Sequence, residues 1–210
     1  MAPEPLLEVV DLACRRGGRR IFDRLSFTLG AGGLLAVVGR NGSGKTTLLR
    51  ALALFARPDA GVIRWRGADV HADPDAWRGE LAWLGHLDGL KGDLTVRENL
   101  LAADALRGGR VGHDRVDGAL VDFDLASLAA RAVRTLSAGQ RRRSALARVV
   151  MSQATVWLLD EPLNALDLSA QDAFRVALER HLLAGGMAIA ATHANIGLPA
   201  ARIFELAARP

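Results

Sequence analysis

The sequence predicts an α/β protein whose central sheet is mostly parallel, because three short apolar runs are mixed with segments of helical pattern. The runs are LLAVV at 34–38, VWLL at 156–159 and GMAIAATH at 186–193. Continuous apolar runs are typical of strands buried on both faces, as in a parallel sheet covered by helices. Such sheets bind ligands beyond the carboxyl ends of their strands. The residues that follow each run are therefore the first candidates for a functional site.

Length and composition fit one globular domain. The chain has 210 residues, of which 50% are hydrophobic, enough to form a sizeable core. Its 27 basic residues produce a net charge of +4, and only Lys45 and Lys91 among them are lysines. This arginine excess is compatible with binding phosphates, acidic lipid or an acidic partner, and equally with the composition of the genome. Charge alone therefore selects no partner.

Several observations bear on the compartment. The single cysteine, Cys14, excludes an intrachain disulfide and suits a reducing environment. The N-terminus MAPEPLLEVVDLA contains acids and prolines and lacks the basic-then-apolar order of a signal peptide. No stretch approaches the roughly 18 consecutive apolar residues that a membrane span requires. We expect a soluble intracellular protein that could dock on a membrane protein.

The segments around the apolar runs differ in character. Residues 5–30 and 61–67 resemble shorter strands around glycine turns, which suggests a small antiparallel sheet. TTLLRALALFA at 46–56 has a helical pattern. Residues 88–150 also have helical periodicity, and Thr95 with Glu98 matches a capping box. We expect a single domain, 1–210, in which a helical lobe at 88–151 is inserted between core segments 1–87 and 152–210.

GRNGSGKT at 39–46 matches the phosphate-loop pattern G-x-x-x-x-G-K-[ST], between an apolar run and a helical pattern. Glycines let the backbone approach phosphates, and N–H groups at a helix N-terminus attract anions. Lys45 is placed to reach the β- and γ-phosphates, and the Thr46 hydroxyl to bind Mg²⁺. A chance glycine-rich turn is the alternative, and the full pattern in this context argues against it. The candidate nucleotide-binding residues are Gly39, Arg40, Asn41, Gly42, Ser43, Gly44, Lys45, Thr46 and Thr47.

Two acids follow the second apolar run. Asp160 is positioned to hold Mg²⁺, directly or through water, and Glu161 to act as base for a hydrolytic water. An Asp-Glu pair before proline could instead be a polar helix start, since acids favour helix N-termini. Beside a phosphate loop, the pair indicates nucleoside triphosphate binding and hydrolysis, with Glu161 and Lys45 as catalytic candidates.

LSAGQRRRSALAR at 136–148 combines small polar residues with three arginines. Ser137 as N-cap and Gln140 three residues later match a capping box. The arginines then share a helix with apolar residues that face a core, namely Ala145, Leu146, Val149 and Val150. A basic patch for nucleic acid is the competing interpretation. We expect the arginines to be mostly solvated or to brace the lobe, with Arg141 nearest any nucleotide interface.

The order of these motifs resembles the ATP-binding subunit of ABC transporters over essentially the whole chain. The phosphate loop is followed by LSAGQ, similar to that family's LSGGQ-type signature, then by VWLLDEP, NALD and a run ending in His193. The resemblance implies a P-loop NTPase fold with a RecA-like core, a small antiparallel β lobe and an inserted helical lobe. It also implies ATP and Mg²⁺ as ligands, and integral membrane subunits rather than nucleic acid as partners.

The family further implies a head-to-tail homodimer that sandwiches ATP between one subunit's phosphate loop and the other's signature. His193 would be the switch histidine at the γ-phosphate. The signature residues acting on the partner's ATP would be Leu136, Ser137, Ala138, Gly139 and Gln140. The D-loop residues would be Asn164, Ala165, Leu166 and Asp167.

Two positions depart from the broad family. His86 lies where most relatives have a glutamine that senses Mg²⁺ and the membrane subunit, and a histidine can also protonate. The family commonly stacks an aromatic residue on adenine near the N-terminus, but this chain has no tyrosine. Arg15 or Arg16 in CRRGGRRIF could stack a guanidinium on the base instead, and Arg16 is the candidate.

Within the family, the chain is most similar to the ATPase subunit of the haem exporter of cytochrome c maturation. The similar stretches include LACRRGGRRIFDRLSFTL, WLGH and LSAGQRRR, and the pair Gly85-His86 resembles a Gly-His that is a feature of that group. Leu54 is a mismatch, since relatives more often have glycine there. The resemblance implies haem export, at the cytoplasmic side of the bacterial inner membrane. The alternatives are another ABC exporter, a DNA- or ribosome-associated ABC-type ATPase, or a small-molecule kinase with a phosphate loop.

Overall fold

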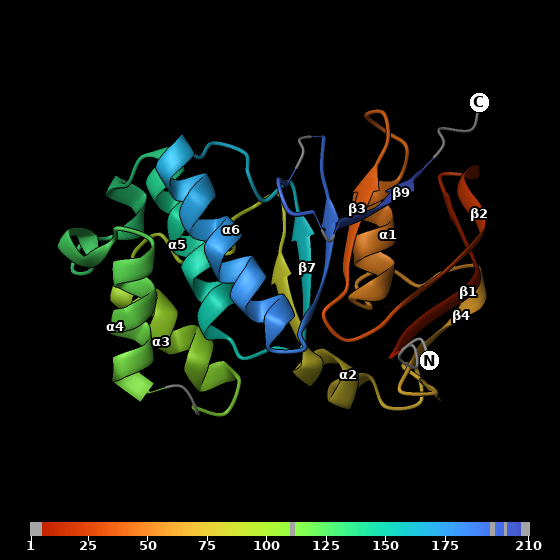
Figure 1. The fold of residues 1–210 in the computed structure, drawn as a ribbon, viewed down its shortest axis with the longest axis horizontal. Coiled ribbons are helices and arrows are strands. Elements are labelled where there is room, and N and C mark those ends of the chain that lie inside the picture. The colour runs from red at the N-terminus through yellow and green to blue at the C-terminus, as the bar shows by residue number, and fades with distance from the viewer. Residues whose placement is uncertain (1–5, 110–111, 194–195, 200, 207–210) are drawn as a thin grey trace.

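The computed structural model describes residues 6–109, 112–193, 196–199 and 201–206. Within these ranges the chain forms a parallel sheet, an antiparallel sheet and a group of helices, arranged side by side (Figure 1). The expected domain limits at 1 and 210, and the first five residues of the N-terminal segment, lie outside the described residues. No helix in the described ranges is long and apolar enough to cross a membrane.

The parallel sheet contains the three apolar runs as neighbouring strands, which confirms the predicted fold class. Its strand order is β6-β7-β8-β3-β9. Every residue of β7 and β8 is buried, as expected for strands covered on both faces. Because the strands are parallel, the residues that follow β3, β7 and β8 meet at one edge. The strands are β3 (Leu34–Val38), β6 (Leu81–Leu84), β7 (Val156–Asp160), β8 (Met187–Ala191) and β9 (Ala201–Glu205).

The two faces of this sheet belong to different cores. Alternate side chains such as Trp157 and Leu159 pack with α5 (Ala138–Met151) and α6 (Leu168–Leu183). Figure 1 shows these two helices next to β7. The intervening side chains, such as Leu158, pack with α1 (Lys45–Leu52) and with the antiparallel sheet. Strand alternation therefore places the helical lobe on one face and the phosphate-loop helix on the other.

Helix α1 is shorter than the pattern at 46–56 predicts. It ends in a Schellman motif, in which Phe55 N–H donates to Arg50 O over 2.8 Å and Leu54 N–H to Ala51 O over 3.1 Å. This motif puts Leu54 in the left-handed region, with a φ of 58°. Glycine adopts that conformation without strain, whereas leucine does so at a cost. The backbone turns here towards Asp59 and β4.

The antiparallel sheet has the order β2-β1-β4-β5 and agrees with the predicted strands. Gly17 and Gly18 connect β1 to β2 with φ values of 56° and 75°. Two consecutive positive φ values are typical of a type I′ hairpin turn, which requires glycine or asparagine. The strands are β1 (Leu7–Arg16), β2 (Arg19–Leu29), β4 (Ala60–Trp65) and β5 (Ala68–Asp69). The short helix α2 (Pro74–Glu80) then leads into β6.

The helical lobe consists of α3 (Val96–Leu106), α4 (Gly112–Asp122), two short 3₁₀ turns (Ala126–Leu128 and Val133–Thr135) and α5. Both predicted capping boxes are present. The Thr95 and Ser137 side chains each accept from the backbone N–H three residues later, and Glu98 and Gln140 accept in return. These caps fix where α3 and α5 begin, and so fix the position of the LSAGQ segment.

Candidate nucleotide-binding site

A pocket of about 540 Å³ opens at the edge where β3, β7 and β8 end. It combines segments that are distant in the sequence, including the β1–β2 hairpin, the phosphate loop, the turn after β6 and the segments that follow β7 and β8. The predicted residues that it brings together are Arg16, Asn41, Gly42, Gly44, Lys45, Thr46, Thr47, His86, Asp160, Glu161, Asn164 and His193. This is the location expected for a ligand of a parallel α/β sheet.

The phosphate loop connects β3 directly to α1, and close packing requires glycine at two of its positions, Gly39 and Gly44. A Cβ at Gly39 would meet Leu206 O at 2.5 Å, and one at Gly44 would overlap the Ile21 side chain. Ser43 Oγ is buried and has no hydrogen-bond partner in the described structure. A buried hydroxyl without a partner is costly unless a ligand satisfies it. The loop therefore fits a phosphate both in backbone shape and in its available donors.

Lys45 is 8% exposed and points back into the loop. Its Nζ donates to Gly39 O at 2.8 Å and approaches Arg40 O at 3.4 Å. The same nitrogen lies 2.9 Å from His193 Nε2. The ammonium is thus held at the helix N-terminus, where it adds a full positive charge to the N–H groups of α1.

Thr46 and Asp160 form the oxygen-rich part of the pocket. Thr46 Oγ1 donates to the Asp160 carboxylate, at 3.1 Å from Oδ1 and 2.9 Å from Oδ2. Asp160 is 3% exposed. A hydroxyl next to a carboxylate fits Mg²⁺, which prefers a few oxygen ligands from the protein and completes its shell with phosphate and water. The described residues include no cluster of three or more His, Cys, Asp or Glu side chains that could hold a metal alone.

Glu161 and His193 face each other across the ends of β7 and β8. Glu161 Oε1 lies 3.4 Å from His193 Nε2, and Oε2 accepts from the His193 backbone N–H at 3.4 Å. Glu161 has a φ of 49°, in the left-handed region that costs a non-glycine residue about 1–3 kcal/mol. Such strain persists only where surrounding contacts fix the backbone, and it often marks a functional position.

The two positions that depart from the broad family both line this pocket. His86 lies in the turn after β6, and Arg16 lies at the end of β1. Arg15, the other arginine considered for adenine, is not among the lining residues, and its backbone N–H donates to Asp59 at 2.6 Å. The pocket geometry therefore favours Arg16 over Arg15.

The LSAGQ segment lies away from this pocket within the same chain. Leu136 is buried, Ser137 and Ala138 are exposed, and Gly139 and Gln140 are partly buried. Instead of meeting the phosphate loop, Gly139 packs on the D-loop, where an added Cβ would meet Ala165 O at 2.9 Å. In the D-loop, Asn164 lines the pocket, Leu166 is partly buried, and Asp167 caps α6 through Ala170 N–H at 2.8 Å.

The three arginines behind the signature have different environments. Arg141 donates to Leu136 O at 2.6 Å, and Arg143 pairs with Asp124 at 3.0 Å, as expected for lobe-bracing residues. Arg142 is 5% exposed and reaches the ends of β6 and β7. The sequence predicts that Arg141 lies nearest any nucleotide interface, but it is the buried Arg142 that contacts the Asp160 and Glu161 carbonyls beside the pocket. The available signal was its spacing, since residue 142 shares one helix face with residues 145, 146 and 149.

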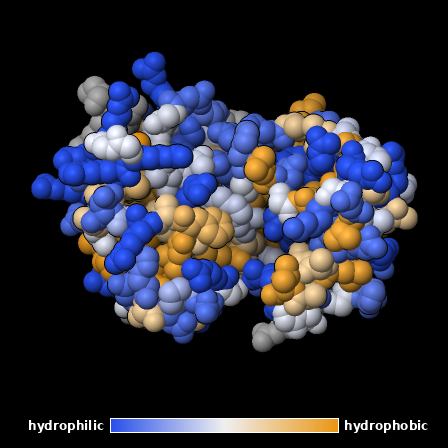
Figure 2. All heavy atoms as spheres, turned by 180° about the vertical axis from the view of Figure 1, so that it is seen from behind, coloured by the Kyte–Doolittle hydropathy of each residue, from blue (hydrophilic) through white to orange (hydrophobic). Residues whose placement is uncertain are grey.

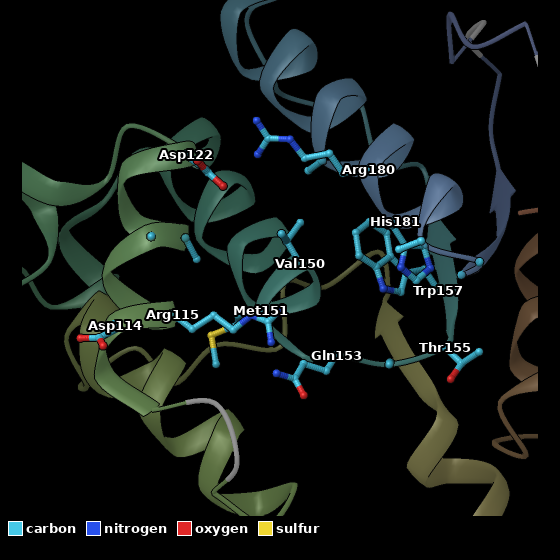
Figure 3. Close-up of a pocket in the computed structure, with 17 residues that line it drawn as sticks. Asp114, Arg115, Asp122, Val150, Met151, Gln153, Thr155, Trp157, Arg180 and His181 are labelled. Atoms are coloured by element: carbon cyan, nitrogen blue, oxygen red, sulfur yellow. The ribbon is translucent and has the colours of Figure 1, made fainter.

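A second cavity, of about 760 Å³, lies between α4, α6 and the segment that leads into β7 (Figure 3). The His181 and Trp157 rings stack in its wall, with centroids 4.0 Å apart and planes within 8°. Burial lowers the pKa of His181. None of the predicted site residues lines this cavity, so it is separate from the candidate nucleotide site.

Comparison with known proteins gives consistent results. Residues 22–164 match the family model described as ABC transporter. The chain is 48% identical over 196 residues to the cytochrome c biogenesis ATP-binding export protein CcmA of Rhodospirillum rubrum, covering 93% of this chain and 83% of that protein. It is 44% identical to the CcmA protein of Nitrosococcus oceani, covering 98% and 94%.

Solved structures show the same fold. One is the ATP-binding subunit of an ABC transporter, with a TM-score of 0.81, 22% identity and coverage of 90% of this chain and 80% of that chain. Another is an ATP-binding protein of ABC transporter type from Pyrococcus furiosus, with a TM-score of 0.81, 24% identity and coverage of 94% and 96%. At these identities the two structures establish the architecture alone.

Proposed function

This chain belongs to the ABC transporter family and is an ATP-hydrolysing transporter subunit, and from this we propose that it powers an export step of c-type cytochrome biogenesis. The observation that carries the chemical part is the single pocket in which Lys45, Thr46, Asp160, Glu161 and His193 meet. The similarity to the cytochrome c biogenesis ATP-binding export proteins of Rhodospirillum rubrum and Nitrosococcus oceani supports the cellular role. Haem as the exported molecule is supported by the stretches that resemble haem exporters.

The residues of the pocket divide the chemistry of hydrolysis between them. The loop N–H groups and Lys45 bind the β- and γ-phosphates and offset their charge. Thr46 and Asp160 would hold Mg²⁺, which neutralises charge on the phosphate oxygens when bound. Glu161 accepts a proton from the attacking water, and the hydrogen bond that its carboxylate accepts from the His193 backbone N–H directs it to that side of the pocket. Arg16 would stack on the base, and His86 takes the position of the metal-sensing glutamine.

Membership of the family implies that the chain functions as a dimer and with membrane subunits. The finer proposal is that Ser137 and Gly139 of one copy bind the γ-phosphate held by its partner. Ser137 is exposed at the N-terminus of α5, where unpaired N–H groups favour an anion. Within one chain this helix end lies away from the phosphate loop, so a second copy is needed to complete each site.

The proposed site for membrane subunits is the face around β6 and α3. A cavity of about 280 Å³ lies there, lined mostly by apolar surface that includes Trp83 and Leu106. Phe55 is 54% exposed, and its ring meets the Trp83 ring edge-on with the two centroids 5.2 Å apart. Leu106 is 89% exposed. From behind, hydrophobic side chains are visible on both sides of the middle of the molecule (Figure 2). Docking here would place the chain peripherally on the cytoplasmic side of the inner membrane.

We also propose that the chain is one functional domain, with core segments 1–87 and 152–210 and a helical lobe at 88–151. His86 and the turn after β6 connect core and lobe directly beside the nucleotide pocket. A membrane subunit bound near this connection could therefore sense the state of the nucleotide.

Substitution of Glu161 by Gln tests the chemical proposal. We expect turnover to fall by about 10²- to 10⁴-fold, the usual contribution of a general base, while ATP binding persists and ATP-dependent dimers accumulate. Glu179→Gln, on the exposed side of α6, is the matched control and should leave turnover unchanged. Undiminished hydrolysis by Glu161→Gln would refute the role of Glu161.

The cellular role needs its own test. Cells that contain only the Glu161→Gln chain should lack c-type cytochromes, whereas cells with Glu179→Gln should contain them. Normal c-type cytochromes in the presence of the inactive chain would refute the proposed pathway. Haem movement into vesicles that contain the chain and its membrane subunits would then test the exported molecule directly.

A further inference from the structure

Arg142 connects three segments that the proposed mechanism uses separately. It lies in the second turn of α5, two residues after the signature, and its side chain is 6% exposed. Nη2 donates to Asp160 O at 2.7 Å and to Glu161 O at 2.6 Å. Nη1 donates to Gly85 O at 2.9 Å and approaches Asp88 Oδ1 at 3.3 Å. One guanidinium thus contacts the end of β7 and both sides of His86.

The contact with Glu161 is made where that residue is strained. Its φ of 49° must be held by neighbours. The Glu161 backbone N–H donates to Ala191 O at 2.8 Å, which fixes one side of the residue to β8. On the other side, the Glu161 carbonyl accepts from Arg142. Since the backbone conformation determines where the side chain starts, these two contacts orient the carboxylate towards His193.

The burial of Arg142 also suggests a specific role, because a buried charge is costly unless it is well paired. Asp88 is its carboxylate partner in the described structure, and the remaining contacts are backbone carbonyls. Arg142 Nε is buried and has no hydrogen-bond partner among the described residues. A residue used only to stabilise the lobe would not require this arrangement, as Arg143 illustrates with its exposed partner Asp124.

We propose that Arg142 is a positioning residue for hydrolysis, which holds the Asp160–Glu161 backbone and the His86 turn in register with the signature helix. This inference rests on the proposed function of Glu161. Movement of α5 on binding the partner's ATP would be transmitted through one rigid guanidinium to the chain's own Glu161. Arginine suits this task because its planar fork donates to several acceptors at fixed geometry.

The test compares Arg142→Gln with Arg143→Gln in the full chain. The two arginines are neighbours in α5, and both donate to backbone carbonyls. We expect Arg142→Gln to lower kcat by about 10²-fold, as for a misplacement of catalytic groups by about 1 Å, with little change in KM or in binding of a non-hydrolysable ATP analogue. Arg143→Gln should keep both kcat and KM. Arg142→Lys, which retains the charge without the fork, should lie between Arg142→Gln and the unchanged chain.

A double-mutant cycle separates positioning from a general structural effect. If Arg142 acts through Glu161, adding Arg142→Gln to Glu161→Gln should lower the single-turnover rate little further. The inference would be overturned if the two substitutions lowered the single-turnover rate by factors that multiply. A rise in KM at constant kcat for Arg142→Gln, or an Arg142→Lys chain as fast as the unchanged one, would overturn it as well. If Glu161→Gln itself turns over normally, the proposed function fails, whereas a slow Glu161→Gln with a fast Arg142→Gln refutes only the role of Arg142.

Discussion

Lys45 Nζ lies 2.9 Å from His193 Nε2, a direct contact between residues 148 positions apart in the chain. An ammonium group only donates, so this contact is a hydrogen bond in the form of the ring whose Nε2 offers a lone pair. Glu161 Oε1, an acceptor 3.4 Å from the same nitrogen, cannot bond to it in that form. Phosphates that attract Lys45 would release Nε2. Phosphate binding would therefore determine whether His193 Nε2 contacts Lys45 or Glu161.

His193→Ala tests this link. The substitution removes a competitor for Lys45, so we expect ATP binding to be preserved or slightly strengthened. Turnover should fall by about 10²-fold, because a preorganised group at the γ-phosphate is lost. Equilibrium binding of a non-hydrolysable analogue and steady-state hydrolysis measure the two quantities. His71→Ala, on the exposed turn after β5, is the control, and weakened ATP binding by His193→Ala alone would contradict the link.

Thr46→Ala tests the proposed Mg²⁺ ligands. The hydroxyl donates to Asp160 at 2.9 Å and would be a direct metal ligand. We expect Mg²⁺ to strengthen ATP binding to the unchanged chain, and the loss of Thr46 to weaken the metal's contribution by about 10- to 100-fold. Nucleotide binding measured with EDTA should be similar in both chains. A variant that responds to Mg²⁺ like the unchanged chain would exclude Thr46 as a ligand.

Gly139→Ala tests the packing of the signature against the D-loop. An added Cβ would lie 2.9 Å from Ala165 O, so the D-loop backbone must shift, at a cost of about 1 kcal/mol. We expect reduced hydrolysis, because Asn164 in the same loop lines the nucleotide pocket. Gly118→Ala in α4 is the matched control. A Cβ there meets no atom of the described residues within 4 Å, and alanine favours a helix, so stability should rise by up to about 1 kcal/mol.

The parts of the fold that could be predicted are those set by local pattern. Buried parallel strands are continuous apolar runs, and parallel strands end at one edge, so the proximity of Asp160 and His193 follows from topology. The Gly17–Gly18 turn and the two capping boxes also follow from local chemistry, because each needs specific residues at fixed spacing.

The parts that could not be predicted depend on contacts between distant segments. Arg142 lies between two similar arginines, and only the packing of α5 on β6 and β7 distinguishes it. Helix α1 ends at Leu52, although leucine and alanine continue beyond it, because Leu54 adopts a left-handed conformation. The Lys45–His193 contact joins the first residue of α1, after β3, to the segment that follows β8, and it depends on where the two side chains point. In each case tertiary packing decides among options that local sequence leaves open.

His181 provides a pH-dependent prediction away from the nucleotide pocket. Its ring stacks on Trp157 (Figure 3), and its Nε2 lies 3.1 Å from Met187 O. Burial is the largest cause that lowers its pKa below the ordinary 6.5, and the backbone contacts oppose that shift. The unfolded chain then binds the proton more readily than the folded one. Stability due to neutral His181 is therefore present above about pH 6.5 and is lost as pH falls towards the lower folded pKa.

The variant His181→Phe isolates this effect, because a phenyl ring can keep the stack on Trp157 but does not titrate. We expect the lost hydrogen bond to Met187 O to lower its stability by about 1 kcal/mol at neutral pH. Its melting temperature should nevertheless fall less on acidification than that of the unchanged chain. His71→Gln, in an exposed turn, should retain the original pH dependence. If the melting temperatures of His181→Phe and the unchanged chain fell equally with pH, His181 would not titrate with unfolding, since every other titrating group is common to both chains.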